Sequence, residues 1–223
     1  MANEHDSFIR EVNEELRSEQ FRNAWARYGR LLMGGAAAAV IATALWGGYE
    51  WWSERQASAS GDQFLAALTL VREGKTAEGD AALKALEADG SGAYPVLARM
   101  RAATLHAEKG DAAAAIAAFT EIGKDTSVPE VVRDTARLRA AYLLVDTGTY
   151  DQVSAEVEQI AVPTNALRHS AREVLGLAAY KAGDMVKAKD WFEQTTTDAQ
   201  APSNVANRAR MMLGLINASG KAP

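Results

Sequence analysis

The strongest feature of the hydropathy pattern is an apolar run near the N-terminus. Residues 31–49 read LLMGGAAAAVIATALWGGY and contain no acidic or basic side chain. A helix of this length measures roughly 28 Å, which is close to the roughly 30 Å hydrocarbon core of a bilayer. The pattern therefore predicts one transmembrane helix over residues 31–49.

The flanks of this run predict its orientation. Arg22, Arg27 and Arg30 precede it with no acidic residue among them, whereas two glutamates and one arginine follow within residues 50–55. Because positive charge is retained in the cytoplasm, the N-terminus is expected there and everything after residue 49 on the far side. Aromatic residues of the kind that favour membrane interfaces mark both boundaries: Trp25, Tyr28, Trp46, Tyr49, Trp51 and Trp52.

Two other interpretations compete with a retained anchor. The run could be the buried helix of a soluble protein, although such helices have less one-sided flanks. It could also belong to a cleaved signal peptide, because residues 57–59 have the A-x-A form of a cleavage site. That site lies far downstream of the apolar core, beyond Trp51 and Trp52.

Small residues inside the run raise the question of a partner helix in the membrane. Ten of its nineteen residues are Gly or Ala, which lets another helix approach closely. The candidate packing positions follow small-xxx-small spacing: Gly34, Gly35, Ala38 and Ala39.

Residues 1–30 form a predicted cytoplasmic arm with a short amphipathic helix. Phe8, Val12 and Leu16 recur at the spacing of one helical face. The arm can be interpreted as a helix resting on lipid headgroups or as a docking helix for a cytoplasmic partner.

Beyond the apolar run, glycines and prolines recur with a period in the mid-thirties. The glycines that end apolar stretches are Gly74, Gly110, Gly148 and Gly183, and the prolines that alternate with them are Pro95, Pro129, Pro163 and Pro202. Proline suits the start of a helix and glycine the residue just past its end. Each period therefore predicts a helical hairpin, and successive hairpins predict an all-α solenoid over residues 60–223, joined to the anchor by a linker over 50–59.

Two of the periods resemble the tetratricopeptide repeat in detail. In KAGDMVKAKDWF, Ala188 and Phe192 follow the Gly183 turn, and Gly176 stands before it. The pattern implies that small residues let the two helices cross closely while the aromatic ring fills the space below. Ala103, Ala115 and Phe119 match in the earlier copy around Gly110. The two degenerate copies carry Ala141, Val153 and Val157, and Ala67, Gly79 and Leu83.

The last apolar segment predicts a single capping helix. The pair Leu213-Gly214 repeats Leu175-Gly176 after 38 residues, and no second helix follows it. Such a helix would cover the last of about four hairpins. The residues expected to provide the cover are Met211, Met212, Leu213 and Ile216.

Composition and motifs argue against catalysis and against nucleic-acid binding. The net charge is -5, which is opposite to the basic stripe of a nucleic-acid binder, and there is no cysteine. The three histidines are scattered, and no metal, phosphate-binding or nucleophile motif is present. We therefore expect no enzyme activity, no metal, no cofactor and no small-molecule substrate.

Surface recognition is the remaining function. The first helices of stacked hairpins line a concave face that suits an extended peptide or a partner helix. Counting back from the glycines places eight residues on that face: Met100, Arg101, Thr104, Arg139, Tyr142, Glu173, Leu177 and Tyr180.

The whole arrangement resembles the YfgM-like ancillary subunits of the bacterial Sec translocon. The resemblance lies in the short arm, the anchor ending in WGGYEWW over residues 46–52, and the degenerate repeats that follow. It implies a single-pass inner-membrane protein with a periplasmic domain, whose partners are SecYEG and a membrane-anchored chaperone of the peptidyl-prolyl isomerase type. Two alternatives are a cell-envelope scaffold that coordinates wall synthesis or division through the same groove, and a subunit of a single-pass enzyme.

Overall fold

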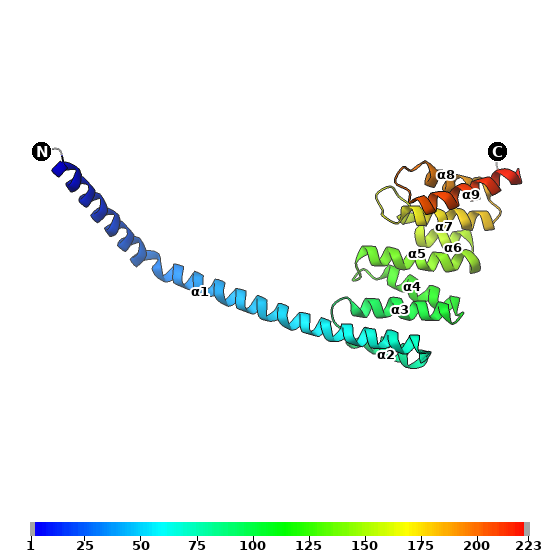
Figure 1. The fold of residues 1–223 in the computed structure, drawn as a ribbon, viewed down its shortest axis with the longest axis horizontal. Coiled ribbons are helices and arrows are strands. Elements are labelled where there is room, and N and C mark those ends of the chain that lie inside the picture. Colours follow the sequence, from blue (N-terminus) through cyan, green and yellow to red (C-terminus); the bar gives the residue numbers. More distant parts are fainter. Residues whose placement is uncertain (1–2, 221–223) are drawn as a thin grey trace. The chain divides into compact units, whose positions relative to one another are not determined.

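The structure, a computed structural model, consists of consecutive helices (Figure 1). It describes the backbone of residues 3–220 and the side chains of residue 22 and residues 25–220, except those of residues 32 and 36. Helices make up 83% of the chain and no strand occurs in residues 3–220, which confirms the all-α prediction. The elements are α1 (Asn3–Arg72), α2 (Thr76–Asp89), α3 (Tyr94–Glu108), α4 (Ala112–Lys124), α5 (Glu130–Thr147), α6 (Tyr150–Val157), a 3-10 turn (Glu158–Ile160), α7 (Arg168–Lys181), α8 (Met185–Thr197) and α9 (Ser203–Ser219).

The chain forms two compact units, residues 1–55 and residues 56–223. The second unit, called the repeat domain below, contains four hairpins among the described residues: the end of α1 with α2, then α3/α4, α5/α6 and α7/α8. Its core consists of clusters that each join neighbouring helices. This is the predicted solenoid of four hairpins followed by one terminal helix.

A small residue lets the two helices of a hairpin approach each other. In α7/α8, Gly176 packs under the ring of Phe192, and a Cβ on Gly176 would lie 2.8 Å from Phe192 Cζ. Both residues are fully buried with Ala188. The corresponding places in the other hairpins are also buried, including those of the degenerate copies: Ala103, Ala115 and Phe119; Ala141, Val153 and Val157; Ala67, Gly79 and Leu83.

The turn inside a hairpin has the same geometry in the two best copies. Gly110 and Gly183 both have a φ of 81°, a left-handed conformation that glycine adopts without strain. The next residue in each copy, Asp111 or Asp184, caps the second helix by accepting a hydrogen bond from a backbone N–H three residues on. The Gly-Asp pair therefore ends one helix and begins the next.

Two of the glycines and prolines that were predicted to end or start helices have a different local structure. Gly148 ends α5 with extended backbone at φ -113°, and Thr149 and Gln152 cap α6 reciprocally. Pro163 does not start a helix, because α7 begins only at Arg168. The intervening loop is held instead by Asn165, which donates to Asp134 Oδ2 at 2.7 Å and accepts from the Leu167 N–H at 2.8 Å.

Residues 50–59, expected as a linker, are helical and belong to the unbroken helix α1. The part of α1 from residue 56 onward is the first helix of the first hairpin: Phe64, Ala67 and Val71 pack in one cluster with side chains of α2 and α3. The repeat domain therefore begins four residues before the predicted boundary. The side chains of the amphipathic stripe predicted at Phe8, Val12 and Leu16 lie outside the described residues.

Helix α9 covers α7 and α8, but with a different set of side chains from the predicted one. Ala209 and Ile216 are buried in the cluster that contains Phe192, and Met212 and Leu213 pack against it. Met211 is 64% exposed, so its expected role in the cover is wrong. The reason is that Met211 lies at the edge of the contact between α9 and α7, where it lines a surface hollow and is not packed in the core.

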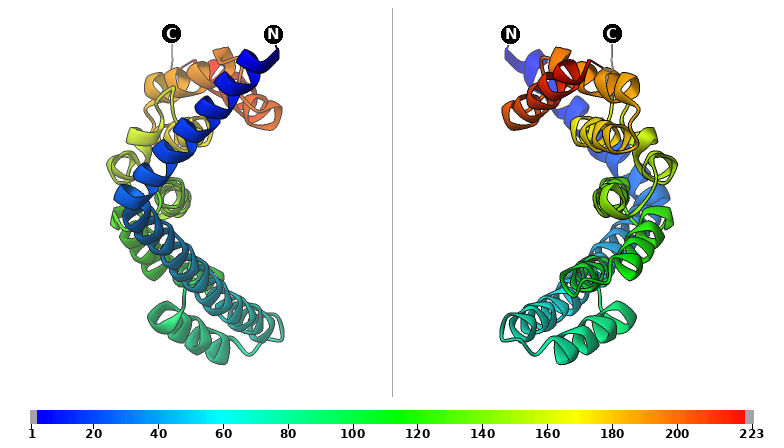
Figure 2. Two further views of the ribbon diagram at one scale, coloured as in Figure 1. Left: turned by 90° about the vertical axis from the view of Figure 1, so that its left-hand side faces the viewer. Right: turned by 90° about the vertical axis from the view of Figure 1, so that its right-hand side faces the viewer.

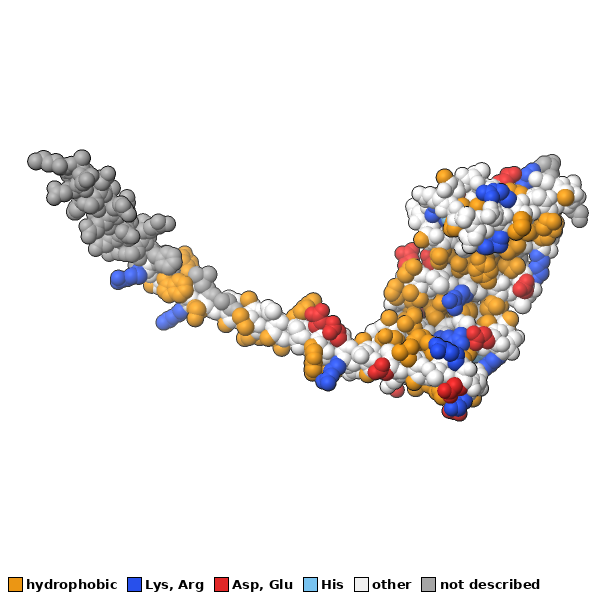
Figure 3. All heavy atoms as spheres, viewed as in Figure 1, with side chains coloured by type: hydrophobic (Ala, Val, Ile, Leu, Met, Phe, Trp, Pro, Cys, Tyr) orange, Lys and Arg blue, Asp and Glu red, His pale blue; other side chains and the backbone are white. Residues whose placement is uncertain are grey.

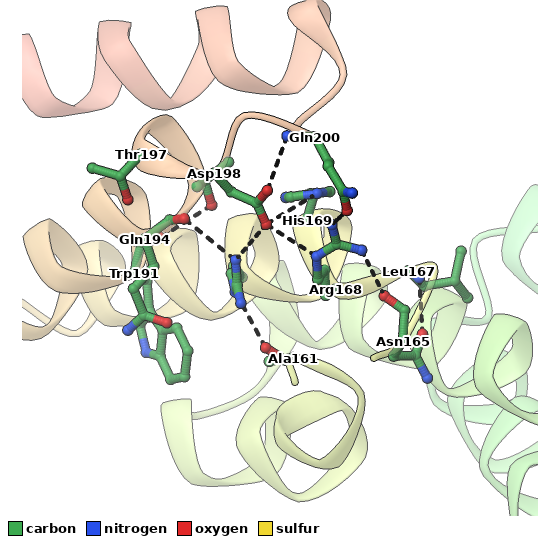
Figure 4. A network of polar contacts seen from close by, with 12 residues as sticks. Ala161, Asn165, Leu167, Arg168, His169, Trp191, Gln194, Thr197, Asp198 and Gln200 are labelled. Atoms are coloured by element: carbon green, nitrogen blue, oxygen red, sulfur yellow. Dashed lines mark hydrogen bonds and ion pairs between the residues drawn. The ribbon is translucent and has the colours of Figure 1, made fainter. Parts of the chain in front are cut away.

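The loop between α8 and α9 is held by Asp198 (Figure 4). Its Oδ2 accepts from Arg168 Nε at 3.0 Å and from Arg172 Nη1 at 3.4 Å, and its Oδ1 accepts from the Gln200 N–H at 2.9 Å. The hydrogen bond from Arg168, followed by that from Gln200, lowers the pKa of Asp198 to about 2. The neighbouring His169 is buried with Nε2 3.5 Å from Oδ2, and burial lowers its pKa.

The loop between α4 and α5 repeats this arrangement. Asp125 accepts from the Ser127 hydroxyl at 2.6 Å and from Arg99 Nη1 at 2.6 Å, and these bonds lower its pKa to about 2. Arg99 and Asp125 are 26 residues apart, as are Arg172 and Asp198. In the second and fourth hairpins, an arginine of the first helix thus contacts the aspartate that follows the second helix.

Acidification is expected to destabilise the repeat domain through these two loops. The folded state lowers the pKa of Asp125 and Asp198 from 3.8 to about 2, so it favours their charged forms. Their stabilising contribution is complete above about pH 4 and is lost as the pH falls toward 2. Thermal melts of the full chain at about pH 5 and pH 2.5 should show a lower midpoint in acid, and Asp198→Asn should reduce that difference. An Asp198→Asn difference as large as that of the wild type would contradict the assignment.

Candidate partner-binding surface

The repeat domain curves, and the first helices of its later hairpins lie on the inside of the curve (Figure 2). There α5, α7 and α9 follow one another, with α7 in contact with both neighbours, while α6 and α8 lie outside. We use the term inner face for the surface of α3, α5, α7 and α9 on this side. All eight residues predicted to bind a partner belong to α3, α5 or α7.

A hollow of about 470 Å³ opens on the inner face between α5, α7 and α9. Three of the predicted residues line it, namely Tyr142, Glu173 and Leu177. Four residues of α9 complete the lining: Arg208, Met211, Met212 and Leu215. Met211 and Leu215 are largely exposed, so the hollow presents apolar side chains to solvent.

The charges in the hollow neutralise each other. Glu173 is 4% exposed and accepts two hydrogen bonds from Arg208, from Nε at 2.5 Å and from Nη2 at 2.7 Å. This bidentate pair ties α9 to α7. Burial, and then the charge of Glu173, raises the pKa of Tyr142, so its phenol stays neutral.

The inner face continues from the hollow toward α3 through Arg139 and Thr104. Arg139 Nη1 donates to Thr104 Oγ1 at 3.1 Å, and its guanidinium lies 5.8 Å from the centroid of the Phe119 ring. Arg101 forms a bidentate pair with Glu108 at 2.8 and 3.1 Å. The structure therefore brings Thr104, Arg139 and Tyr142 into one continuous strip.

The two other predicted residues lie partly in the core. Met100 packs against the cluster around Phe119, and Tyr180 packs against the cluster around Phe192. Conversely, the sequence predicted Met211 and Met212 for the capping contact only, and it did not predict Arg208 or Leu215 for the hollow. The repeat register contained the signal, because Met211 and Leu215 stand 38 residues after Glu173 and Leu177, the same offset as between the two Leu-Gly pairs.

The described side chains of residues 31–49 in α1 are exposed (Figure 3). Within Trp25–Arg72 this helix is long and apolar enough to cross a membrane. Its most apolar 18-residue segment has a mean hydropathy of 1.6, and none of that segment is buried. The exposed large side chains include the predicted interfacial ones: Trp25, Tyr28, Trp46, Tyr49, Trp51 and Trp52.

The predicted packing positions in this helix are open. Nothing lies within 4 Å of a Cβ built on Gly34 or on Gly35, and Ala38 and Ala39 are exposed. A second helix could approach this surface closely, and its presence stays a prediction.

Few side chains in the part of the chain that the structure describes are arranged as a metal-binding or catalytic site would need. No group of three or more His, Asp or Glu side chains there is placed to hold a metal ion. His169 lies close to Asp198 in the loop between α8 and α9. Neither residue lines the hollow, and their contact belongs to the polar network that holds that loop.

A family model for a tetratricopeptide repeat-like domain matches residues 22–214. The chain belongs to this family. No curated protein and no solved structure matches the chain significantly. The matched region includes the apolar part of α1 together with the four hairpins and most of α9.

Membership of the tetratricopeptide repeat-like family defines the general role of the molecule. Domains of this kind are typically non-enzymatic scaffolds that bind other proteins, and no catalytic family is indicated. The matched residues include α3, α5, α7 and most of α9, and every residue that lines the hollow except Leu215. Family membership therefore indicates protein–protein interaction as the general role of the repeat domain.

Proposed function

We propose that this protein is a membrane-tethered scaffold that binds other polypeptides through the inner face of its repeat domain, next to the Sec translocon. The observation that carries the proposal is the open, apolar hollow formed by α5, α7 and α9. Exposed apolar surface that is concave and bordered by polar groups is typical of protein-binding sites.

The tether is the apolar part of α1, with the N-terminus in the cytoplasm and the repeat domain in the periplasm. The arginines before residue 31 and the glutamates after residue 49 support this orientation. Residues 57–59 lie within α1 and are followed by Ser60, whose Oγ accepts from the Ser91 N–H at 2.9 Å. This region is thus part of the folded repeat domain, which favours a retained anchor over a cleaved signal peptide.

The expected partners are SecYEG and a membrane-anchored chaperone of the peptidyl-prolyl isomerase type. Support comes from the resemblance to the YfgM-like subunits, which combines the arm, the anchor and the aromatic cluster after it with degenerate repeats. In this role the inner face would help to receive polypeptides that emerge from the translocon.

Crosslinking from the inner face in intact bacterial membranes tests this function. A photoreactive amino acid at Tyr142, which lines the hollow and is 42% exposed, is expected to capture SecY or a periplasmic chaperone identified by mass spectrometry. The matched control is Val186, which is exposed on α8 away from the hollow and should not give the same adduct.

Other crosslinked proteins would support the alternative function or contradict the proposal. Capture of wall-synthesis or division proteins in place of SecY would support the envelope-scaffold alternative. A cytoplasmic protein captured at Tyr142 would overturn the orientation, and equal capture at Tyr142 and Val186 would overturn the role of the inner face.

A further inference from the structure

Arg139 has a positive charge that the described part of the chain does not neutralise. Of the three inner-face arginines, Arg101 is paired with Glu108 and Arg208 with Glu173. Among the described residues, Arg139 donates a hydrogen bond to the neutral hydroxyl of Thr104 and forms no ion pair. A guanidinium binds a carboxylate bidentately and more strongly than it binds a hydroxyl, so Arg139 is the inner-face group best suited to an incoming acidic residue.

The hollow beside it favours an apolar side chain. Its only described charges, Glu173 and Arg208, satisfy each other, so an incoming charge would gain little there. Met211 and Met212 have flexible thioether side chains that adapt to differently shaped apolar groups. Leu177 and Leu215 complete an apolar lining on two helices.

The spacing between these two features defines what fits. Arg139 and Tyr142 are three residues apart on α5, which places their Cβ atoms about 5–6 Å apart on one face. A partner helix presents side chains at a similar separation when they are three or four residues apart, and an extended segment does so when they are two apart.

We infer that the inner face selects a partner segment in which an apolar residue enters the hollow while a carboxylate about one helical turn away pairs with Arg139. This inference rests on the proposed function, in which the inner face binds a polypeptide. It adds a rule for the partner: an acidic residue next to an apolar one is preferred over a neutral or basic one.

Peptide binding to the full chain in lipid nanodiscs tests the rule. The probes are three fluorescein-labelled peptides of about sixteen residues, alike in a stripe of leucines and differing in the residue one turn from each leucine, which is Glu, Gln or Lys. Fluorescence anisotropy should show the Glu peptide binding roughly tenfold more tightly than the other two.

Two variants measure separately what the charge of Arg139 and the apolar hollow contribute to binding. Arg139→Gln should bring all three affinities to within about twofold of one another, while Met211→Glu should weaken all three by about tenfold or more. Met211 is exposed, so its replacement leaves the core unchanged. The matched controls, Arg210→Gln and Val186→Glu, change exposed residues outside the hollow and should bind as the wild type does.

The outcomes distinguish this inference from the proposed function. Equal binding of the three peptides, lost in Met211→Glu but unchanged in Arg139→Gln, would overturn the acidic preference and leave the hollow as a binding site. Failure of the wild type to bind any peptide would overturn both. A change of oligomeric state caused by Met211→Glu in sedimentation would identify a second copy as the occupant and also overturn the inference.

Discussion

Replacing Phe192 by alanine is expected to lower the free energy of unfolding of the repeat domain by roughly 3–5 kcal/mol. The ring is completely buried between Gly176, Ala188 and the α9 residue Ile216. Its removal leaves a cavity that the helix backbones and the surrounding side chains fill only in part.

The effect should be confined to the C-terminal part of the domain. In a stack of repeats each unit contacts only its neighbours, so hydrogen exchange should show protection lost in α7, α8 and α9 and retained in α2–α4. Val186→Ala, an exposed change on the same helix, is the control and should have an effect within about 0.5 kcal/mol. A Phe192→Ala variant that unfolds like this control would contradict the assigned packing.

Replacing Arg172 by leucine is the second change with a large expected effect, about 2–5 kcal/mol of destabilisation. Arg172 is buried and donates to the carbonyl oxygens of Ala161 at 3.1 Å and Gln194 at 3.3 Å, and to Asp198 at 3.4 Å. Leucine fills similar space but leaves these acceptors without a donor. A urea titration of the full chain, followed by circular dichroism, measures the loss.

Two further variants show whether the network is responsible. Arg172→Lys should recover only part of the stability, because one ammonium group does not reach acceptors on both sides as a planar guanidinium does. Arg210→Leu replaces an exposed arginine of α9 and should be almost neutral. Full recovery by lysine, or equal losses in Arg172→Leu and Arg210→Leu, would show that these hydrogen bonds do not stabilise the loop.

Local patterns were sufficient to predict the hairpins. Gly110 and Gly183 end helices because only glycine adopts the left-handed turn without strain, and this requirement acts within a few residues of chain. The small residues that face Phe119 and Phe192 recur at a fixed offset from those glycines, so the core of each hairpin could also be predicted. Gly148 and Pro163 show the limit, because Thr149 and Gln152 cap α6 through their side chains, and Asn165 stabilises a loop before α7 through its side chain.

The site depended more on contacts between distant residues. Tyr142 and Leu177 were predicted for the inner face, but the hollow exists only because α9 places Met211 and Leu215 opposite them. The pairing of Glu173 with Arg208 joins residues 35 positions apart and neutralises a buried charge in the lining of the hollow. No pattern along one helix reveals which arginine is paired and which is available.

The sequence by itself determined that the chain is all-α, that one helix can cross a membrane and that hairpins repeat with a period in the mid-thirties. Each of these follows from spacing along the chain, because turn conformation and helix length depend on residues that are close in the sequence. Tertiary structure alone decided that Met211 faces a hollow and that Arg139 has no carboxylate partner among the described residues. These depend on how successive hairpins stack, and stacking is set by the sum of many contacts between helices.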